Sequence, residues 1–222
     1  MIETVTLFAT SGSRSRLNGQ ADANWATGLA AARNAATGIA GGSDSSYLGT
    51  ARMGSCCTLE EYCQRHILVF DAADAPQLAT SSILRVQFLF TPHLLNGFTL
   101  SNPATSLVMA GGFAYSGAGG EFAQILSQTA ANGIAMGATN DSSVGTPRLG
   151  ANDVPLTWFN RGGVMEFGLA NSADLAQTAL TQPAGGQSSG TQFAIRSYAY
   201  AAVDHRPQLI VSYTRSNMLM VF

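Results

Sequence analysis

The stretch Ser82-Ile83-Leu84-Arg85-Val86-Gln87-Phe88-Leu89-Phe90 decides the fold class of this chain, and Thr91-Pro92 follows it. Its residues fall into two alternating sets, a period of two that is typical of a β-strand. Proline stops such a run because it has no N–H for the strand ladder. A second stretch, Gln208 to Thr214, alternates in the same way and places Leu209, Val211 and Tyr213 on one face. We therefore expect both stretches to be strands that turn one face towards a core.

Shorter segments of the same kind fill most of the remaining chain. Further strands are expected at 3–8, 47–53, 65–70, 106–115, 154–159, 164–169 and 191–200. Helices are expected at 21–36, 121–129 and 173–180, the last capped by Asn171 or Ser172, and 138–152 is expected to be a loop. Short strands separated by glycines predict an all-β fold, an antiparallel jelly-roll β-sandwich with short helices in the connections. We expect a single domain over 1–222, with an Ala-rich insertion at 21–38 and an apolar tail at 215–222.

The composition is poor in charge. Charged residues make up 11% of the 222 residues, against about 25% in typical domains. All 11 basic residues are arginine, which excludes mechanisms that need a catalytic or phosphate-binding lysine. The net charge of −2 supplies no basic excess for binding nucleic acid. A surface with so few charges is poorly protected against association, so we expect the protein to assemble with partners.

The first residues carry no export or membrane signal. Met1 to Phe8 has an early acid at Glu3, no basic region and no long apolar run. We therefore expect synthesis in a cytoplasm, no signal peptide and no membrane partner.

Three cysteines, Cys56, Cys57 and Cys63, lie within eight residues of one another, and His66 follows them. Zinc needs four ligands, and this cluster lacks the fourth, so a disulfide between Cys63 and one of the adjacent pair is favoured over a zinc site. Idle buried thiols and an intermolecular bridge remain as alternatives. We expect no cofactor and no catalytic residue. Asp204-His205 has no oriented nucleophile, and the acids Glu60, Glu61, Asp71 and Asp74 lack the spacing of a calcium loop.

Several segments share a pattern with one known family. They are Leu68-Val69-Phe70-Asp71, Pro76, Ser82-Ile83-Leu84-Arg85-Val86, Phe193-Ala194-Ile195-Arg196-Ser197 and Arg206-Pro207-Gln208-Leu209-Ile210-Val211-Ser212-Tyr213. Together they resemble the DNRLRE (disaggregatase-related) β-sandwich domains over about 65–214. The resemblance implies a non-catalytic accessory module, usually on secreted or surface proteins and often beside carbohydrate-active enzymes. The chain departs from that pattern at Ser197, where the family has an acid, and at Ile195, where it has serine.

Two further features suggest contacts with other molecules. Tyr198 and Tyr200 would alternate onto the same face of the strand expected at 191–200, where they could stack on a sugar. The tail residues Met218, Leu219, Met220, Val221 and Phe222 are all apolar and would form an assembly contact if exposed.

Together these observations lead to one expected function and one alternative. We expect a non-enzymatic structural protein of a bacteriophage virion, either a capsid decoration (cement) protein or a tail-accessory subunit. It would be made in the host cytoplasm, reside in the virion, and bind other virion proteins and further copies of itself. The alternative is a carbohydrate-binding module that recognises cell-surface glycans.

Overall fold

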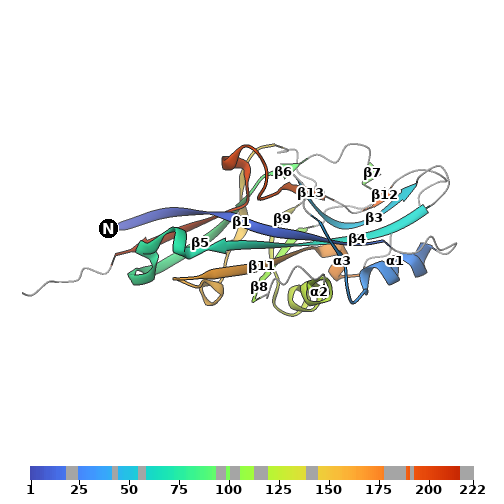
Figure 1. Ribbon diagram of the computed structural model, residues 1–222, viewed down its shortest axis with the longest axis horizontal. Helices are drawn as coiled ribbons and strands as arrows, with labels where there is room; N and C mark the ends of the chain where they lie inside the picture. Colours follow the sequence, from blue (N-terminus) through green and yellow to red (C-terminus); the bar gives the residue numbers. More distant parts are fainter. Residues whose placement is uncertain are drawn as a thin grey trace, which may run out of the picture.

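The computed structural model describes residues 1–18, 25–41, 45–54, 59–93, 99–100, 106–112, 120–138, 145–177, 189–190 and 193–215. These residues form mostly antiparallel β-structure with short helices (Figure 1), which confirms the expected all-β fold. The strands are β1 (Ile2–Asn18), β2 (Ile39–Gly41), β3 (Ser45–Gly54), β4 (Leu59–Asp71), β5 (Ser82–Phe90), β6 (Pro92–His93), β7 (Thr99–Leu100), β8 (Ser106–Gly111), β9 (Ile134–Ala138), β10 (Arg148–Asp153), β11 (Val164–Asn171), β12 (Ser189–Gly190), β13 (Phe193–Arg196) and β14 (Gln208–Thr214). The helices are α1 (Trp25–Arg33), α2 (Glu121–Asn132) and α3 (Ser172–Leu175), and the 3-10 turns are η1 (Ala72–Asp74), η2 (Pro76–Thr80), η3 (Leu156–Trp158) and η4 (Val203–His205).

Two layers share strand β1. We call the layer β10-β5-β14-β1 sheet A; it uses β1 up to Phe8. We call the layer β1-β4-β11-β8-β9 sheet B; it uses β1 from Ala9 onward. A β-bulge between Ala9 and Ser11 marks the change of layer. A single strand therefore connects both halves of the sandwich.

The main core lies between these two sheets. The alternation seen in the sequence places Phe88 and Phe90 of β5 and Leu209 and Val211 of β14 in it, all of them buried. Phe88 and Phe90 stack at 5.5 Å between ring centroids. The alternating apolar residues of these strands thus mark the face of the sheet that is buried in the core, as expected for a sheet with one apolar face.

Strand β4 is buried on both faces. Leu68 and Phe70 belong to the core between the sheets, whereas Ile67 and Val69 belong to a second apolar cluster with Ile125 of α2. The helices lie along this second face of sheet B, on the side of the molecule away from the orange-red loop that contains η4 (Figure 1). No described helix is long and apolar enough to span a membrane.

The two outermost strands of the sheet path come together. The Asn152 side chain of β10 donates to the Ala135 carbonyl of β9 at 2.7 Å. Gly150 of β10 also lies so close to Met136 that a Cβ would come within 2.8 Å of its sulfur. Side-chain contacts thus join β9 to β10 where the sandwich nearly closes.

Several expectations about secondary structure need correction. The strand expected at 154–159 is wrong, because Pro155 precedes the 3-10 turn η3 there. Strands β9 and β10 were not expected, since they are rich in glycine, alanine and asparagine, which are weak strand formers. The strand expected at 191–200 ends at Arg196, and α3 ends at Leu175. The expected cap of α3 is confirmed, because Asn171 Oδ1 accepts from the Ala173 N–H at 2.9 Å.

Candidate functional site

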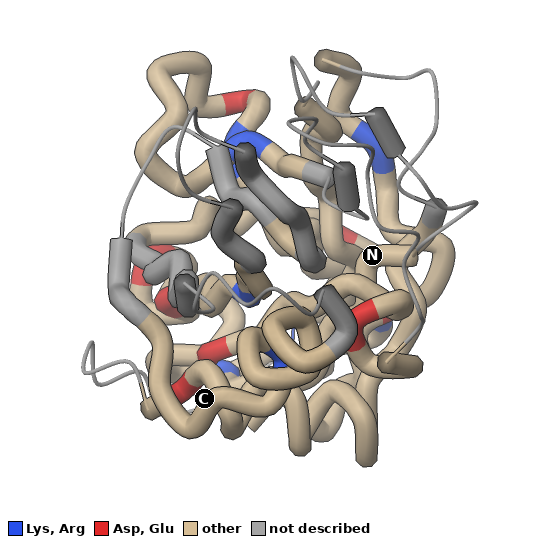
Figure 2. Tube along the Cα trace, turned by 90° about the vertical axis from the view of Figure 1, so that its right-hand side faces the viewer, with Lys and Arg blue, Asp and Glu red and all other residues tan. Residues whose placement is uncertain are grey.

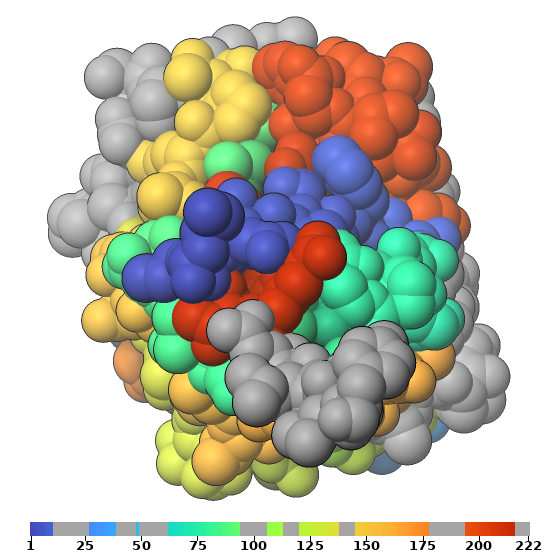
Figure 3. Space-filling view, turned by 90° about the vertical axis from the view of Figure 1, so that its left-hand side faces the viewer, coloured from blue at the N-terminus to red at the C-terminus, as the bar shows by residue number. Residues whose placement is uncertain are grey.

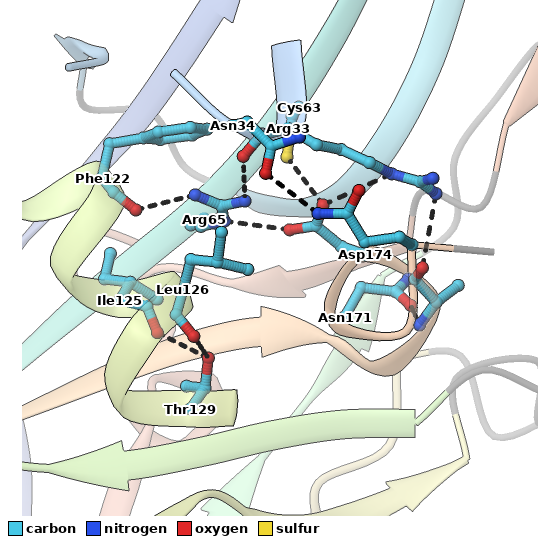
Figure 4. A network of polar contacts seen from close by, with 12 residues as sticks. Arg33, Asn34, Cys63, Arg65, Phe122, Ile125, Leu126, Thr129, Asn171 and Asp174 are labelled. Atoms are coloured by element: carbon cyan, nitrogen blue, oxygen red, sulfur yellow. Dashed lines mark hydrogen bonds and ion pairs between the residues drawn. The ribbon is translucent and has the colours of Figure 1, made fainter. Parts of the chain in front are cut away.

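The described part of the chain contains one deeply buried cluster of charged and polar side chains (Figure 4). Asp174 lies at its centre and contacts Arg65 and Cys63 of β4 and Arg33 of α1. These four side chains are at most 3% exposed. We call them the buried polar cluster.

Local structure brings these residues to one place. Cys63 and Arg65 alternate along β4 with residues of the opposite face, so both point towards the helices, as Ile67 does. Arg33 is the last residue of α1, and Asp174 lies in α3 directly after its Asn171 cap. The cluster therefore joins one strand to two helices that are far apart in sequence.

Arg65 uses its whole guanidinium group. Its Nε donates to Asp174 Oδ2 at 2.9 Å. Its Nη1 donates to the Phe122 carbonyl of α2 at 2.8 Å, and its Nη2 donates to the Arg33 carbonyl of α1 at 2.6 Å. The guanidinium carbon also lies 4.1 Å from the centroid of the Phe122 ring. Arg65 thus bonds to all three helices, and its charge is compensated as a buried charge must be.

Cys63 and Arg33 complete the surroundings of Asp174. The Cys63 thiol donates to Asp174 Oδ1 at 3.2 Å, and Arg33 Nε lies 3.6 Å from the same oxygen. Burial, and secondarily the nearby Asp174 carboxylate, raise the pKa of the Cys63 thiol well above its ordinary value. Burial lowers the pKa of Arg33, and Asp174 opposes this effect. The thiol is therefore held in its neutral form.

This cluster performs a structural role. A reactive thiol needs a lowered pKa and access to solvent, and Cys63 has neither. At the surface, the Gln177 side chain donates to Asn34 Oδ1 at 3.0 Å and links the ends of α3 and α1 once more. The cluster attaches the helices to sheet B.

The structure places the cysteines differently from the sequence prediction. Cys63 is a free thiol, so the favoured disulfide is not formed at this residue. Cys63 and His66 lie three residues apart on β4 and therefore point to opposite faces, which excludes their joint use as zinc ligands. Cys56 and Cys57 lie outside the described residues.

The two tyrosines proposed for sugar stacking do not share a strand face, because β13 ends before them. Tyr198 is partly buried and packs against the main core. The guanidinium group of Arg196 stacks over the ring of Tyr200, and its central carbon lies 4.1 Å from the ring centroid. His205 lies 6.1 Å from the same ring. The arrangement expected from strand alternation is wrong, and sugar binding itself stays a prediction.

The remaining candidates are dispersed. The apolar tail Met218 to Phe222 lies outside the described residues. Asp204 and His205 form an ion-pair contact of 3.9 Å in which Asp204 is largely exposed. Asp71 Oδ1 accepts from the Ala73 N–H and so caps η1. Among the side chains that the structure describes, no group of three metal-ligating residues comes together.

A second feature is the face of sheet A that points away from the core, which we call the outer face of sheet A. Strand register aligns Phe8, Gln208, Leu89 and Leu149 in one row across its four strands. Phe8 is 37% exposed and Leu149 46%. Leu84, next to the bulge of β5, is 47% exposed.

The described charged side chains on this face form a neutral pair. Arg85 Nε donates to both carboxylate oxygens of Asp153, at 2.9 and 2.8 Å. At one end of sheet A, Arg215 pairs with Glu3, where Figure 3 shows the blue start of β1 beside the red end of β14. Charged residues are also sparse along the described trace in the view of Figure 2.

Sequence reasoning missed the buried polar cluster. The sequence places Arg33, Arg65 and Asp174 only in two expected helices and an expected strand, with no role for any of them. A signal was present, because Arg65 and His66 directly precede the apolar run Ile67 to Phe70 in the same strand. A charge in a strand buried on both faces requires a partner of opposite charge.

Comparison with known proteins identifies no family. No family model matches the chain, and no curated protein matches it. Among solved structures, infectious bursal disease virus of the Gt strain is 12% identical over 96% of this chain and 38% of the other, with a TM-score of 0.25. A subviral particle of the VP2 protein of the same virus is 12% identical over 96% of this chain and 60% of the other, with a TM-score of 0.20. The chain thus spans less than two thirds of these proteins, and scores this low assign no function to it.

Proposed function

We propose that this chain is a non-enzymatic structural protein of a virus particle and that it acts through contacts with other protein chains. In its specific form, the proposal is a capsid decoration (cement) protein or a tail-accessory subunit of a bacteriophage. The observation that carries the proposal is the outer face of sheet A, on which Phe8, Leu84 and Leu149 are exposed and the described charges are paired.

Such a face is suited to association. Removing exposed apolar side chains such as Phe8, Leu84 and Leu149 from water is favourable, at about 25 cal/mol per Å² of apolar area. The neighbouring polar residues on β1 are Thr4 and Thr6, whose short hydroxyl side chains are cheaper to desolvate than ions. The Arg85–Asp153 pair adds no net charge. A partner with a flat, uncharged surface would therefore bind without leaving a buried ion unpaired.

The rest of the molecule supports this interpretation. The buried polar cluster has a structural role, so its residues are accounted for without catalysis. The lysine-free composition gives the protein little charge repulsion against a neighbour. The resemblance to the DNRLRE accessory modules also favours a supporting role, and we retain membership of that family as part of the proposal.

The test is to locate the chain in particles. Antibodies raised against the purified chain would be applied to gradient-purified particles from the cells that produce it, with mass spectrometry of the same fractions. The expected result is regular labelling of capsid or tail at a constant copy number. A chain that stays in the particle-free fraction, and that is monomeric at high concentration by light scattering, would refute the proposal.

A matched pair of variants connects this test to the outer face of sheet A. Leu149→Glu introduces a charge on that face and is expected to abolish incorporation into particles. Ser127→Glu introduces the same charge at an exposed position of α2 and should leave incorporation unchanged. Equal incorporation of both variants would show that another surface makes the contact.

A further inference from the structure

Arg196 carries a charge that the described residues leave uncompensated. It ends β13, and its side chain lies over the Tyr200 ring. Arg33, Arg65, Arg85 and Arg215 each contact a carboxylate, whereas no described carboxylate pairs with Arg196. Arg196 Nε is buried and has no hydrogen-bond partner. A buried arginine Nε without a partner is unusual, because buried polar groups are normally hydrogen-bonded.

A second unsatisfied group lies beside it. The Arg196 backbone N–H donates to the Thr91 carbonyl at 2.9 Å, which extends the antiparallel pairing of β13 with β6. Residues paired in this way present their side chains on the same face of the ladder. Thr91 is fully buried, and its Oγ1 also has no hydrogen-bond partner. Two unpartnered side-chain donors thus lie on one face of the β6–β13 ladder, which continues into β3 on the other side of β13.

One nearby arginine adds positive charge, whereas the neighbouring histidine does not. Burial, and secondarily the charge of Arg196, lower the pKa of His93, which is paired with Ala194 in the same ladder, so this imidazole is neutral near pH 7. Arg206 Nε donates to the Tyr200 carbonyl at 2.7 Å. Asp204 is largely exposed, and its carboxylate lies 3.9 Å from His205 Nε2. The segment 196–206 thus contains two arginines and one aspartate, in a chain whose net charge is −2.

The surroundings of this charge are apolar. The loop that follows β13 exposes Ala199, Ala201 and Ala202, and Val203 in η4 is 45% exposed. An arginine and a tyrosine surrounded by small apolar residues have the composition of a protein-binding hot spot. Sugar stacking is less favoured, since Arg196 already covers one face of the Tyr200 ring.

We infer that Arg196, held against Tyr200, is the docking point for an aspartate or glutamate side chain of a neighbouring protein subunit. The inference rests on the proposed assembly function, for which it specifies the chemistry of one contact. The planar guanidinium presents parallel N–H donors that match the two oxygens of a carboxylate. The apolar loop would cover the residues that flank this acid and exclude water from the ion pair.

Peptide binding to the isotope-labelled full chain tests the inference. The probe is acetyl-Val-Glu-Val-amide, and its neutral counterpart is acetyl-Val-Gln-Val-amide. We expect saturable NMR shifts of the amides of 194–206 at millimolar concentrations of the glutamate peptide, and binding about tenfold weaker for the glutamine peptide. Binding should also weaken with added salt, because partly exposed charges are screened.

Four variants identify the residues responsible. Arg196→Gln should abolish binding of the glutamate peptide, whereas Arg161→Gln, which removes an exposed arginine that donates to the Ser81 carbonyl, should leave it unchanged. Arg196→Lys keeps the charge but loses the planar donors, and Tyr200→Leu keeps the charge but loses the supporting ring. Both are expected to bind several-fold more weakly, and they serve as the test if Arg196→Gln does not fold.

Three results would overturn the inference. The first is equal binding of the two peptides, and the second is unchanged binding of the glutamate peptide by the Arg196→Lys and Tyr200→Leu variants. The third is tighter binding of glucuronate than of the glutamate peptide, because that result would identify an acidic saccharide as the ligand. Because these measurements use the isolated chain, they can fail while the protein is still found in particles. Conversely, if the chain binds the peptide but is absent from particles, the proposed function is refuted and the inference about Arg196 is not.

Discussion

Asp174 lies between the guanidinium groups of Arg33 and Arg65 at a position fully removed from solvent. Replacing it by asparagine keeps the side-chain volume but removes the compensating charge. We predict that Asp174→Asn lowers the free energy of unfolding by about 3–5 kcal/mol, because two buried cations lose their partner. Urea unfolding followed by circular dichroism measures this loss.

Asp153→Asn is the matched control for that variant. It also breaks an arginine–aspartate pair, but both side chains are about half exposed. Exposed pairs contribute little, so its effect should be far smaller. Similar losses for the two variants would contradict the structural role assigned to the buried polar cluster.

Cys63 gives a second prediction, on pH dependence. The folded state raises the pKa of this thiol, so the folded protein binds the proton more tightly than the unfolded chain does. The resulting stability is fully present below the ordinary thiol pKa of about 8.5 and is lost as the pH rises towards the folded value. The loss is at most about 1.4 kcal/mol per pH unit.

Urea unfolding at pH 7.5, 8.5 and 9.5 tests this dependence under reducing conditions. Serine does not titrate in this range, so Cys63→Ser should show a flatter profile than the native chain. The absence of lysine leaves few other groups that titrate there. Parallel profiles for the two proteins would be inconsistent with a buried, neutral thiol.

At the scale of single residues, the sequence could indicate that Arg65 needs a partner, but not which residue supplies it. Asp174 lies 109 positions away in the chain, and its location depends on the packing of α3 against β4. The cysteine spacing suggested a local disulfide or metal site. The thiol of Cys63 instead contacts a distant carboxylate, because strand alternation directs it towards the helices.

Among the elements, the packing of β8 against the η3 segment is especially tight. A Cβ at Gly111 would lie 2.7–2.9 Å from atoms of Trp158. We predict that Gly111→Ala destabilises the protein by about 1–3 kcal/mol, since the indole ring must move within a filled space. The thermal unfolding midpoint measures the effect.

Gly162→Ala serves as the control for this variant. A Cβ at Gly162 would have no atom within 4 Å, so this substitution should be nearly neutral. If both alanine variants unfold at the same temperature, the space between Gly111 of β8 and Trp158 can accommodate a methyl group without loss of stability.

Strong alternation made some elements predictable to the residue. Strands β5 and β14 begin and end where the sequence indicated, because a complete apolar face specifies both their extent and their register. Strands β9 and β10 lack such a face. Their place comes from the strands beside them and from contacts such as that of Asn152 with the Ala135 carbonyl, which no local pattern reveals.

For the whole molecule, the exposed apolar side chains on the outer face of sheet A predict self-association. We expect the native chain to show a rising weight-average mass with concentration in light scattering. A Phe8→Glu variant should remain monomeric, because a charge on the face opposes burial. The change should leave folding intact, since Phe8 points away from the core, and circular dichroism checks this. An identical mass profile for the two proteins would show that this face is not self-adhesive.

The antiparallel ladder between β1 and β14 also bears on biosynthesis. Ile2 is aligned with Thr214, so β1 leaves the ribosome long before the strand that becomes its neighbour. Contacts of such long sequence separation slow folding and lengthen the time during which strand edges remain open. Sheet A can therefore form only after β14 has been synthesised, and nascent chains that stall before β14 should depend on chaperones to stay soluble.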